Sequence, residues 1–312
     1  MKTGLFVNSI KANCSIYESG IMIRNILWKS QLFSLDYIEA TPTTIPRIDF
    51  SPYDFYVLNW HHFTLPIPQD VLGGLKGKKI AIVLEVFPND CFPHTPKWFD
   101  AYMVIDPTKE KDGKEKIYPF PRPLETFLPT LPEKTQNDLP VIGSFGLLTP
   151  GKRFEEIIQV ANTMGNCVVR INLPPVTYMG DIGASKRLTD YAKWLHSLAR
   201  PNVDLTVTHN YMTKRELIEW CCQNTINVFP YYRTQSGLAA TTDQAIVAGR
   251  AIAITSNHAF HHMHPYISYY PKQGYWELIE STPPGVAQMQ KDWHPAVFLS
   301  RFEEMLSEEG VL

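Results

Sequence analysis

The sequence predicts an α/β protein with two Rossmann-like domains, each a doubly wound parallel sheet, facing a cleft. Short apolar runs alternate with stretches of helical periodicity along the whole chain. The apolar runs are nearly continuous, as is typical of strands covered on both faces. The alternation stops once, at a proline-rich stretch, and then restarts. A chain of 312 residues, 44% of them hydrophobic and 19% charged, is long enough for two hydrophobic cores.

The first domain is expected over residues 1–128. It begins with a strand at residues 4–10, and a helix follows at residues 15–28, where isoleucines recur at helical spacing. The further strands expected in this half are residues 33–38, 55–58, 79–84 and 101–105. A strand that leads directly into a helix opens a parallel sheet, so this half is expected to be doubly wound.

Prolines and a charged segment at residues 133–138 predict a linker over residues 126–139, because proline fixes φ and donates no hydrogen bond. The second domain is then expected over residues 140–295. Its predicted strands are residues 141–145, 167–171 and 203–207, and its predicted helices are residues 154–164 and 186–198. The last segment, residues 296–312, contains an amphipathic helix that we expect to pack back on the first domain.

Two short patterns mark helix boundaries in the second half. Thr213 and Glu216 have the spacing of a capping box, in which each side chain accepts from the other's backbone N–H. Residues 228–255 predict a buried strand, a polar turn closed by Ser236 and Gly237, a small-residue helix ended by Gly249, and a second strand. A polar turn that opens a helix directs unpaired N–H groups and a positive dipole at an anion, so this segment predicts a diphosphate site of the kind that binds nucleotide-sugars.

The composition excludes several classes of protein. A net charge of -2 and a pI near 6.6 give no overall basic field for nucleic acid or anionic membranes. The five cysteines form an odd set without paired spacing, which favours reduced thiols. No apolar run approaches twenty residues, and the N-terminus has no long apolar core. We therefore expect a cytoplasmic protein without a transmembrane segment.

Three segments resemble the GT-B fold glycosyltransferases, particularly the large retaining family four. Residues 142–153 look like the family's glycine-loop-lysine motif, which ends here at Lys152 and Arg153. Residues 204–230 resemble the segment that caps the nucleobase, and residues 236–249 match the carboxylate, seven residues, carboxylate motif in length and in its closing glycine. The resemblance implies hexosyl or pentosyl transfer, with retention, from a donor such as a UDP-sugar to an acceptor hydroxyl on a glycan, lipid-linked or protein substrate. It implies no metal and no cofactor.

The motif departs from the family at both acidic positions. Ser236 and Gln244 stand where the family has glutamates. Gln244 offers an amide oxygen to the ribose hydroxyls, and Asp243 is a second acceptor beside it. Ser236 offers only a hydroxyl, together with the backbone N–H groups of Ser236 and Gly237. The loss of both carboxylates leaves open a degenerate nucleotide-sugar-binding module without catalysis.

The chemistry of sugar transfer assigns candidate roles. Negative charge grows on the leaving diphosphate, so Lys152 and Arg153 are the candidates for stabilising it. Glu85 and Asp90 follow a predicted buried strand, and either one is a candidate acceptor for the proton of the acceptor hydroxyl. Tyr211 precedes the capping box, where it is a candidate for stacking on the base. The remaining candidates for contact with the acceptor or the sugar are the paired residues His61 and His62.

Three alternatives follow from other features. His258, His261, His262 and His264 are spaced for a zinc or nickel site, but no cysteine or clear carboxylate ligand lies nearby, so we expect no metal. A nucleic acid acceptor, as for enzymes that glycosylate hydroxymethylated DNA bases, requires a basic track. The candidate members of that track are Lys76, Lys78, Lys79, Lys109, Lys111, Lys114 and Lys116. A dehydrogenase is disfavoured, because the turn at residues 8–20 lacks a GxGxxG fingerprint.

Overall fold

The structure is a computed structural model that describes residues 1–10, 15–48, 50, 53–127, 129–131, 139–175, 184–270 and 274–312. The chain divides into two compact units. The first unit contains residues Met1–Glu125, Ser236–Leu238 and Asp292–Leu312, and the second contains residues Thr126–Gln235 and Ala239–Lys291. The charged segment at residues 133–138 and Cys14 lie outside the described residues. Cys91, Cys167, Cys221 and Cys222 are free thiols.

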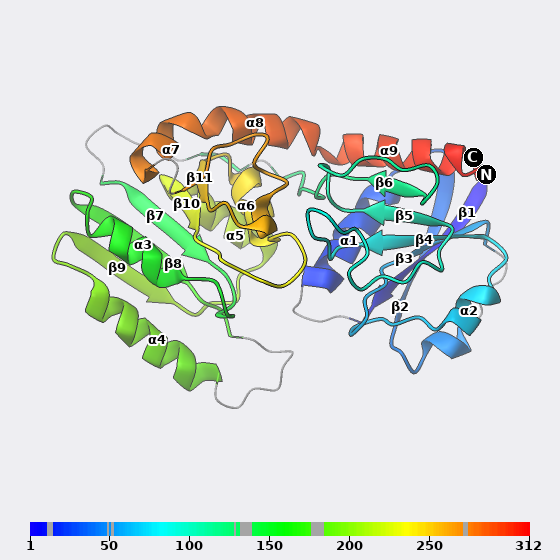
Figure 1. The fold of residues 1–312 in the computed structure, drawn as a ribbon, viewed down its shortest axis with the longest axis horizontal. Helices are drawn as coiled ribbons and strands as arrows, with labels where there is room; N and C mark the ends of the chain where they lie inside the picture. Colours follow the sequence, from blue (N-terminus) through cyan, green and yellow to red (C-terminus); the bar gives the residue numbers. More distant parts are fainter. Residues whose placement is uncertain are drawn as a thin grey trace. The chain divides into compact units, whose positions relative to one another are not determined.

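The first unit is built on a six-stranded sheet in which every neighbouring pair is parallel (Figure 1). In spatial order the strands are β2 (Phe33–Ala40), β1 (Lys2–Ser9), β3 (Phe55–Leu58), β4 (Lys78–Val83), β5 (Ala101–Val104) and β6 (Ile117–Pro119). Helix α1 (Ser15–Leu27) follows β1, and the short helices η1 (Ile45–Arg47) and α2 (Gln69–Gly73) lie in the connections. The sequence did not predict β6, because it lies within the proline-rich stretch.

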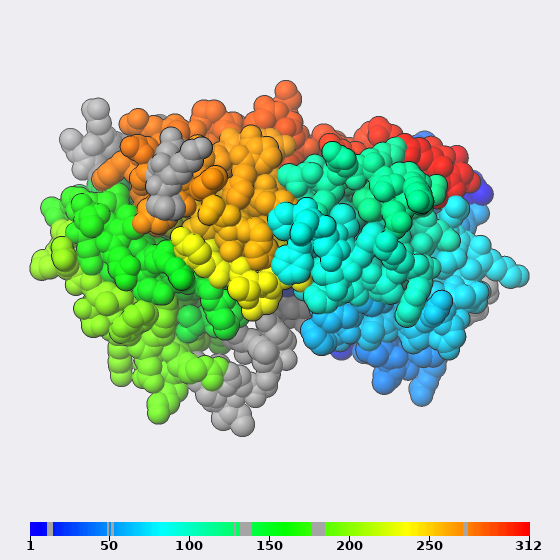
Figure 2. Space-filling view, viewed as in Figure 1, coloured from blue at the N-terminus to red at the C-terminus, as the bar shows by residue number. Residues whose placement is uncertain are grey.

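Both faces of this sheet are buried, which confirms the doubly wound prediction. Along β1, Leu5 and Val7 belong to one hydrophobic cluster and Phe6 belongs to the other. The same alternation runs along β3 and β4, as the period of two in a strand requires. Helix α9 (Pro295–Glu308) covers the Phe6 side, where Phe298 packs against Phe120 with 4.9 Å between ring centroids. Figure 2 shows this helix, in red, lying against the teal surface around β6.

The second unit contains a five-stranded parallel sheet (Figure 1). Its strands, in spatial order, are β11 (Ala251–Ile254), β10 (Ile226–Phe229), β7 (Val141–Phe145), β8 (Cys167–Asn172) and β9 (Val203–Thr208). Its helices are α3 (Phe154–Ala161), α4 (Ala184–Leu198), α5 (Lys214–Cys222), α6 (Thr241–Ala248), η2 (His258–Phe260), α7 (Tyr275–Ser281) and α8 (Pro283–Asp292). The two parallel sheets confirm the predicted fold class.

The capping box and one helix boundary test the local predictions. At the start of α5, the Thr213 hydroxyl accepts from the N–H of Glu216, and the Glu216 carboxylate accepts from the N–H of Thr213 at 2.8 Å, as predicted. The prediction that Ser236 and Gly237 open a helix is wrong. Helix α6 begins at Thr241, and the N–H of Gly237 donates to the carbonyl of Val86 at 2.9 Å. That amide is therefore already satisfied by a strand-end loop of the first unit.

Within the described ranges, no helix combines the length and apolar character needed to cross a membrane. The loops that carry the candidate residues follow the carboxyl ends of parallel strands. Lys152 follows β7, and His61 and Glu85 follow β3 and β4. Ligands of open α/β sheets bind at this edge.

Candidate functional site

Glycines shape the loop that carries Lys152. Gly146, directly after β7, has φ 142°, and Gly151 has φ 81°. A Cβ atom on Gly151 would lie 2.7 Å from the carbonyl oxygen of Tyr232, whose N–H donates to the carbonyl of Gly151 at 2.8 Å. Only glycine fits this close approach. The loop is therefore pinned to the chain that leaves β10, and it delivers Lys152 to a defined place.

The Lys152 ammonium is buried against an aromatic ring. Its Nζ lies 3.5 Å from the ring centroid of Tyr231, and the residue is 8% exposed. Burial lowers the pKa of Lys152 well below its ordinary value, and the charge of Arg233 lowers it further. Among the residues that the structure describes, no carboxylate pairs with this ammonium. Buried charges in proteins are normally paired, so this site is suited to an anion from outside the chain.

Three groups surround the position that the Cβ atom of a larger residue would occupy at Gly146. A Cβ atom on Gly146 would lie 3.3 Å from the Tyr231 hydroxyl, 3.4 Å from Cγ2 of Thr241 and 3.7 Å from the Lys152 ammonium. The Tyr231 and Thr241 hydroxyls are 3.0 Å apart and share a hydrogen bond. The helix start that accompanies Lys152 is thus that of α6 at Thr241, and its positive dipole end adds to the attraction for an anion.

Arg153 lies in a different environment from Lys152, although the two are adjacent. Its guanidinium pairs with Glu156 at 2.6 Å and stacks on the ring of Tyr232 at 4.2 Å. The side chain is 47% exposed. The hydrogen bond that Arg153 donates to Glu156 raises the pKa of Arg153. From the sequence we assigned the same role to both cations. In the structure, Arg153 is paired with Glu156, whereas Lys152 is buried and no carboxylate of the described ranges pairs with it.

The other predicted donor-site residues differ in burial. Asp243, in the first turn of α6, is 5% exposed, and Gln244 beside it is half-buried. Tyr211, in the loop after β9, is 53% exposed. Ser236 is buried, at 6% exposure, and belongs with the first unit. Lys152, Asp243 and Gln244 all belong to the second unit, as does Tyr211.

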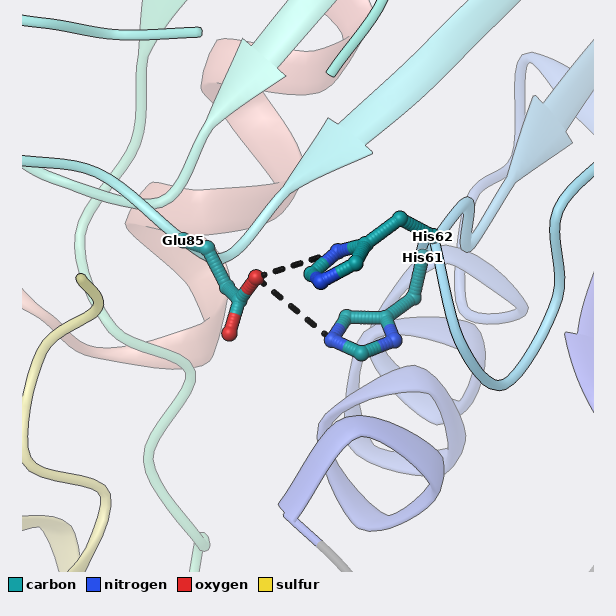
Figure 3. A group of neighbouring side chains, drawn as sticks. All are labelled: His61, His62 and Glu85. Carbon is teal, nitrogen blue, oxygen red and sulfur yellow. Dashed lines mark ion pairs between the residues drawn. The ribbon is translucent and has the colours of Figure 1, made fainter. Parts of the chain in front are cut away.

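The acceptor-side candidates form a histidine and glutamate cluster in the first unit (Figure 3). One oxygen of Glu85, Oε2, lies 3.5 Å from Nε2 of His61 and 3.4 Å from Nδ1 of His62. The ring of His62 also contacts the rings of His61 and His94, with 4.6 Å and 4.4 Å between ring centroids. Burial raises the pKa of the Glu85 carboxyl, but the hydrogen bond from His61 and the three histidine charges outweigh it, so the net pKa is lowered.

Asp90 is not part of this cluster. It is exposed, its backbone closes a tight turn with Phe87, and its Oδ1 accepts from the N–H of Phe92 at 2.7 Å. A carboxylate that caps its own turn in this way has a structural role. Of the two predicted carboxylates, the geometry therefore favours Glu85 for chemistry.

The three side chains have the spacing of metal ligands, but the tautomer of His61 does not suit metal binding. Atoms of His61, His62 and Glu85 lie within 4.8 Å of one another. However, Nδ1 of His61 accepts from the N–H groups of Phe63 at 3.3 Å and Thr64 at 3.2 Å. Its proton must then be on Nε2, which leaves no lone pair there for a metal, whereas metal-bound histidines donate from their other nitrogen.

The four histidines at the end of the second-unit sheet do not gather around one point. Within the described ranges, they bring no three ligand atoms within 4.8 Å. Ring nitrogens of three of them lie within hydrogen-bonding distance of main-chain carbonyls: His258 with Gln235, His261 with His258, and His264 with Thr255. Burial lowers the pKa of His264. These residues brace a loop.

The predicted basic track is largely neutralised by carboxylates or used in main-chain contacts. Its pairs are Lys78 and Lys116 with Glu309, Lys79 with Asp100, and Lys111 with Glu308. Lys109 donates to the carbonyls of Phe87 and Pro88. Paired lysines release few counterions on binding DNA. A nucleic acid acceptor is therefore not supported.

Tyr231, Thr241 and His94 are site residues that the sequence reasoning missed. Tyr231 lies two residues beyond β10, in the same strand-exit position that directs attention to Lys152 after β7. The signal that could have identified Tyr231 is an aromatic residue just after a strand that pairs with the strand before the glycine-loop-lysine motif. Nothing local marks His94, which joins the cluster only through tertiary packing.

Comparisons with known proteins show the fold. No family model matches the sequence, and no curated protein matches it. HepE from Anabaena in complex with UDP and glucose is similar in structure, with a TM-score of 0.63 and 10% identity over 99% of this chain and 100% of that one. The lipopolysaccharide outer core galactosyltransferase WaaB gives 0.62 and 9% over 99% and 100%.

The α,α-trehalose 6-phosphate synthase of Burkholderia multivorans gives a TM-score of 0.56 and 10% identity over 98% of this chain and 94% of that one. Together with the two parallel sheets, these full-length matches confirm the GT-B fold that the sequence motifs predicted.

Proposed function

We propose that the protein transfers a sugar from a UDP-sugar to an acceptor hydroxyl. Its two-sheet fold is similar to that of the galactosyltransferase WaaB and to that of HepE, whose structure contains UDP and glucose. The fold alone carries many activities, so the proposal depends on the site. The observation that carries it is the buried Lys152 ammonium, which no carboxylate of the described ranges neutralises.

Lys152 suits a leaving diphosphate on physical grounds. An anion beside Gly146 would face the ammonium and the start of α6, and its negative charge would pair with the buried ammonium. Charge on the diphosphate increases as the bond to the sugar breaks, so the attraction is stronger in the transition state than in the ground state. Lys152 is therefore proposed as a catalytic residue as well as a binding residue.

The remaining donor contacts are assigned by position. Asp243 and Gln244 at the start of α6 are proposed to accept from the ribose hydroxyls, and exposed Tyr211 is proposed to stack on the uracil ring. Arg153 is proposed to contribute only weakly, because Glu156 and Tyr232 already hold it. No metal takes part in this scheme, and retention at the anomeric carbon is the outcome that the family resemblance implies.

Isothermal titration calorimetry with UDP tests the donor site directly. Wild-type protein is expected to bind UDP without added metal, and Lys152→Met is expected to weaken binding while keeping the same melting temperature or a higher one. Lys193→Met, which removes an exposed lysine from α4, is the matched control. Wild-type protein that fails to bind UDP would contradict the proposal.

Turnover is tested by UDP release from UDP-glucose and UDP-galactose, and NMR of the early product reports the anomeric configuration. UDP binding without release from these donors, in water and with sugar acceptors added, would favour a non-catalytic binding module.

A further inference from the structure

Two loops of the first unit bring His61, His62 and Glu85 together. Strands β3 and β4 are adjacent and parallel, with Leu58 paired to Ala81, so the residues that follow them emerge at the same edge of the sheet. His61 closes a tight turn with Leu65 through two backbone hydrogen bonds. That turn presents the amides of Phe63 and Thr64 to the His61 ring.

The hydrogen bonds of this turn determine which nitrogen of His61 carries the proton. Nδ1 accepts two backbone N–H groups, so the proton is on Nε2, 3.5 Å from Oε2 of Glu85. Nδ1 of His61 is therefore engaged, and Nε2 lies at ion-pair distance from the Glu85 carboxylate, which it can help to position.

The two ring nitrogens of His62 lie in different surroundings. Its Nδ1 is buried, has no hydrogen-bond partner at normal distance, and faces Oε2 of Glu85 at 3.4 Å. A lone pair on Nδ1 would lie 3.4 Å from a carboxylate oxygen and be repelled by it, so the favoured tautomer has its proton on Nδ1. The lone pair is then on Nε2, for which the described ranges show no hydrogen bond. The side chain is 24% exposed.

We propose that His62 is the catalytic base that takes the proton from the acceptor hydroxyl, with Glu85 and His61 as positioning residues. This inference rests on the proposed sugar transfer and names the group that activates its acceptor. The acceptor O–H proton moves to Nε2 of His62 as the oxygen bonds to the anomeric carbon. The bond from that carbon to the diphosphate breaks, and the diphosphate leaves with the electron pair.

The arrangement follows the logic of other activated bases. A carboxylate that accepts from Nδ1 orients the imidazole, fixes its tautomer and stabilises the imidazolium that forms. The separation of 3.4 Å is long for a hydrogen bond, but such contacts are often loose before substrate binds. Neutral histidine is needed for this role. Burial lowers the pKa of His62, and the charges of His61 and His94 lower it further, while Glu85 opposes them.

The groups packed against the His62 ring differ in their effect on its pKa: His61 and His94 lower it and Glu85 raises it, while burial, the largest cause, makes the net shift a lowering. The contacts are the rings of His61, Phe63, His94 and Trp60 and the carboxylate of Glu85. Glu85 is the one anion among them, and it also faces His61. Burial outweighs this anion, so at neutral pH His62 carries a proton only on Nδ1 and can accept a second one on Nε2.

Histidine NMR tests the inference without any substrate. Full-length protein with ¹⁵N-labelled histidine rings is expected to show His62 as the Nδ1–H tautomer and His61 as the Nε2–H tautomer at pH 7.5, each assigned through its glutamine variant. The pKa of His62 is expected below 6.5, the ordinary value for histidine. A His62 that carries its proton on Nε2, or that is charged at pH 7.5, would overturn the proposal.

Kinetics test the same residue through UDP-glucose turnover, with water or added glucose as acceptor. His62→Gln is expected to lower kcat by roughly 10²- to 10⁴-fold, the usual contribution of a general base, with the Kd for UDP within twofold of wild type. His196→Gln, which changes an exposed histidine of α4, is the matched control and should leave kcat unchanged. Equal kcat in wild type and His62→Gln would refute the base.

The positioning role of Glu85 has its own signature. Because the Glu85 charge raises the pKa of His62, Glu85→Gln is expected to move the acid limb of the kcat profile to lower pH and to lower kcat about tenfold. A purely structural carboxylate would leave that limb in place. Different results would refute the two proposals. Wild-type protein that does not bind UDP would refute sugar transfer, whereas UDP-glucose turnover that is unchanged in His62→Gln would refute only the role of His62 as the base.

Discussion

Replacing Lys152 by methionine isolates the charge of the buried ammonium. Methionine keeps much of the length and the contact with Tyr231 but removes the positive charge. A hydrogen bond to a charged group contributes about 1.5–3 kcal/mol, so UDP affinity should fall roughly 10- to 150-fold. The loss in kcat/KM should be larger than the loss in affinity, because the diphosphate gains charge in the transition state.

The stability of the same variant has a defined pH dependence. Burial lowers the pKa of Lys152 below its ordinary 10.5 in the folded protein, so between these two pKa values the unfolded chain binds more protons. The unfolding free energy of wild type should therefore rise with pH through that window, relative to Lys152→Met. Below the folded pKa, where the buried ammonium is fully charged, the variant should be at least as stable as wild type.

Calorimetry links binding to the same proton. An anion beside Lys152 raises its pKa, so UDP binding to wild type at pH 8.5 should take up protons, measured as a heat that varies with the ionisation enthalpy of the buffer. Lys152→Met should show no such uptake, and Lys193→Met should behave as wild type. The reasoning is refuted if Lys152→Met binds UDP as tightly as wild type, or if Lys193→Met loses as much affinity.

Three further substitutions probe the site and the fold. Arg153→Ala should change the Kd for UDP by less than about fivefold, since an exposed pair contributes roughly 0.2–1 kcal/mol; a loss equal to that of Lys152→Met would reverse the roles assigned here. Gly146→Ala should cost about 1–3 kcal/mol in thermal unfolding, because φ is 142°, and should also weaken UDP binding, because its Cβ would lie 3.7 Å from Lys152 Nζ; unchanged affinity would show that the anion does not bind beside Gly146. Glu309→Gln should lower the unfolding free energy by about 1.5–3 kcal/mol at pH 7, because the 1% exposed carboxylate accepts from Tyr118 at 2.6 Å and from two lysines. Burial raises the pKa of Glu309, but these bonds lower it by more, so the net pKa in the folded protein is below 4.5. The stabilisation by the carboxylate is therefore present above pH 4.5 and should vanish as pH falls through the folded pKa. A variant whose stability has the same acid profile as wild type would contradict this.

Local patterns were sufficient for most of the fold. The strands can be recognised in the sequence because a strand buried on both faces needs consecutive apolar residues, as β3 and β4 have. The capping box at Thr213 can be predicted because its two partners are three residues apart and need no other part of the chain. Strand β6 was missed because its pairing with β5 overrides a local composition that reads as an irregular connection.

The sequence by itself determined two parallel-sheet domains and the glycine loop that ends at Lys152, since both follow from periodicity and from backbone conformations that only glycine adopts readily. Only the tertiary structure decided that Lys152 is buried on Tyr231 without a carboxylate of the described ranges, while Arg153 beside it is paired. Only the tertiary structure joined His62 to Glu85, 3.4 Å apart, through the adjacency of β3 and β4. Burial and charge pairing depend on residues distant in the chain, so no local pattern encodes them.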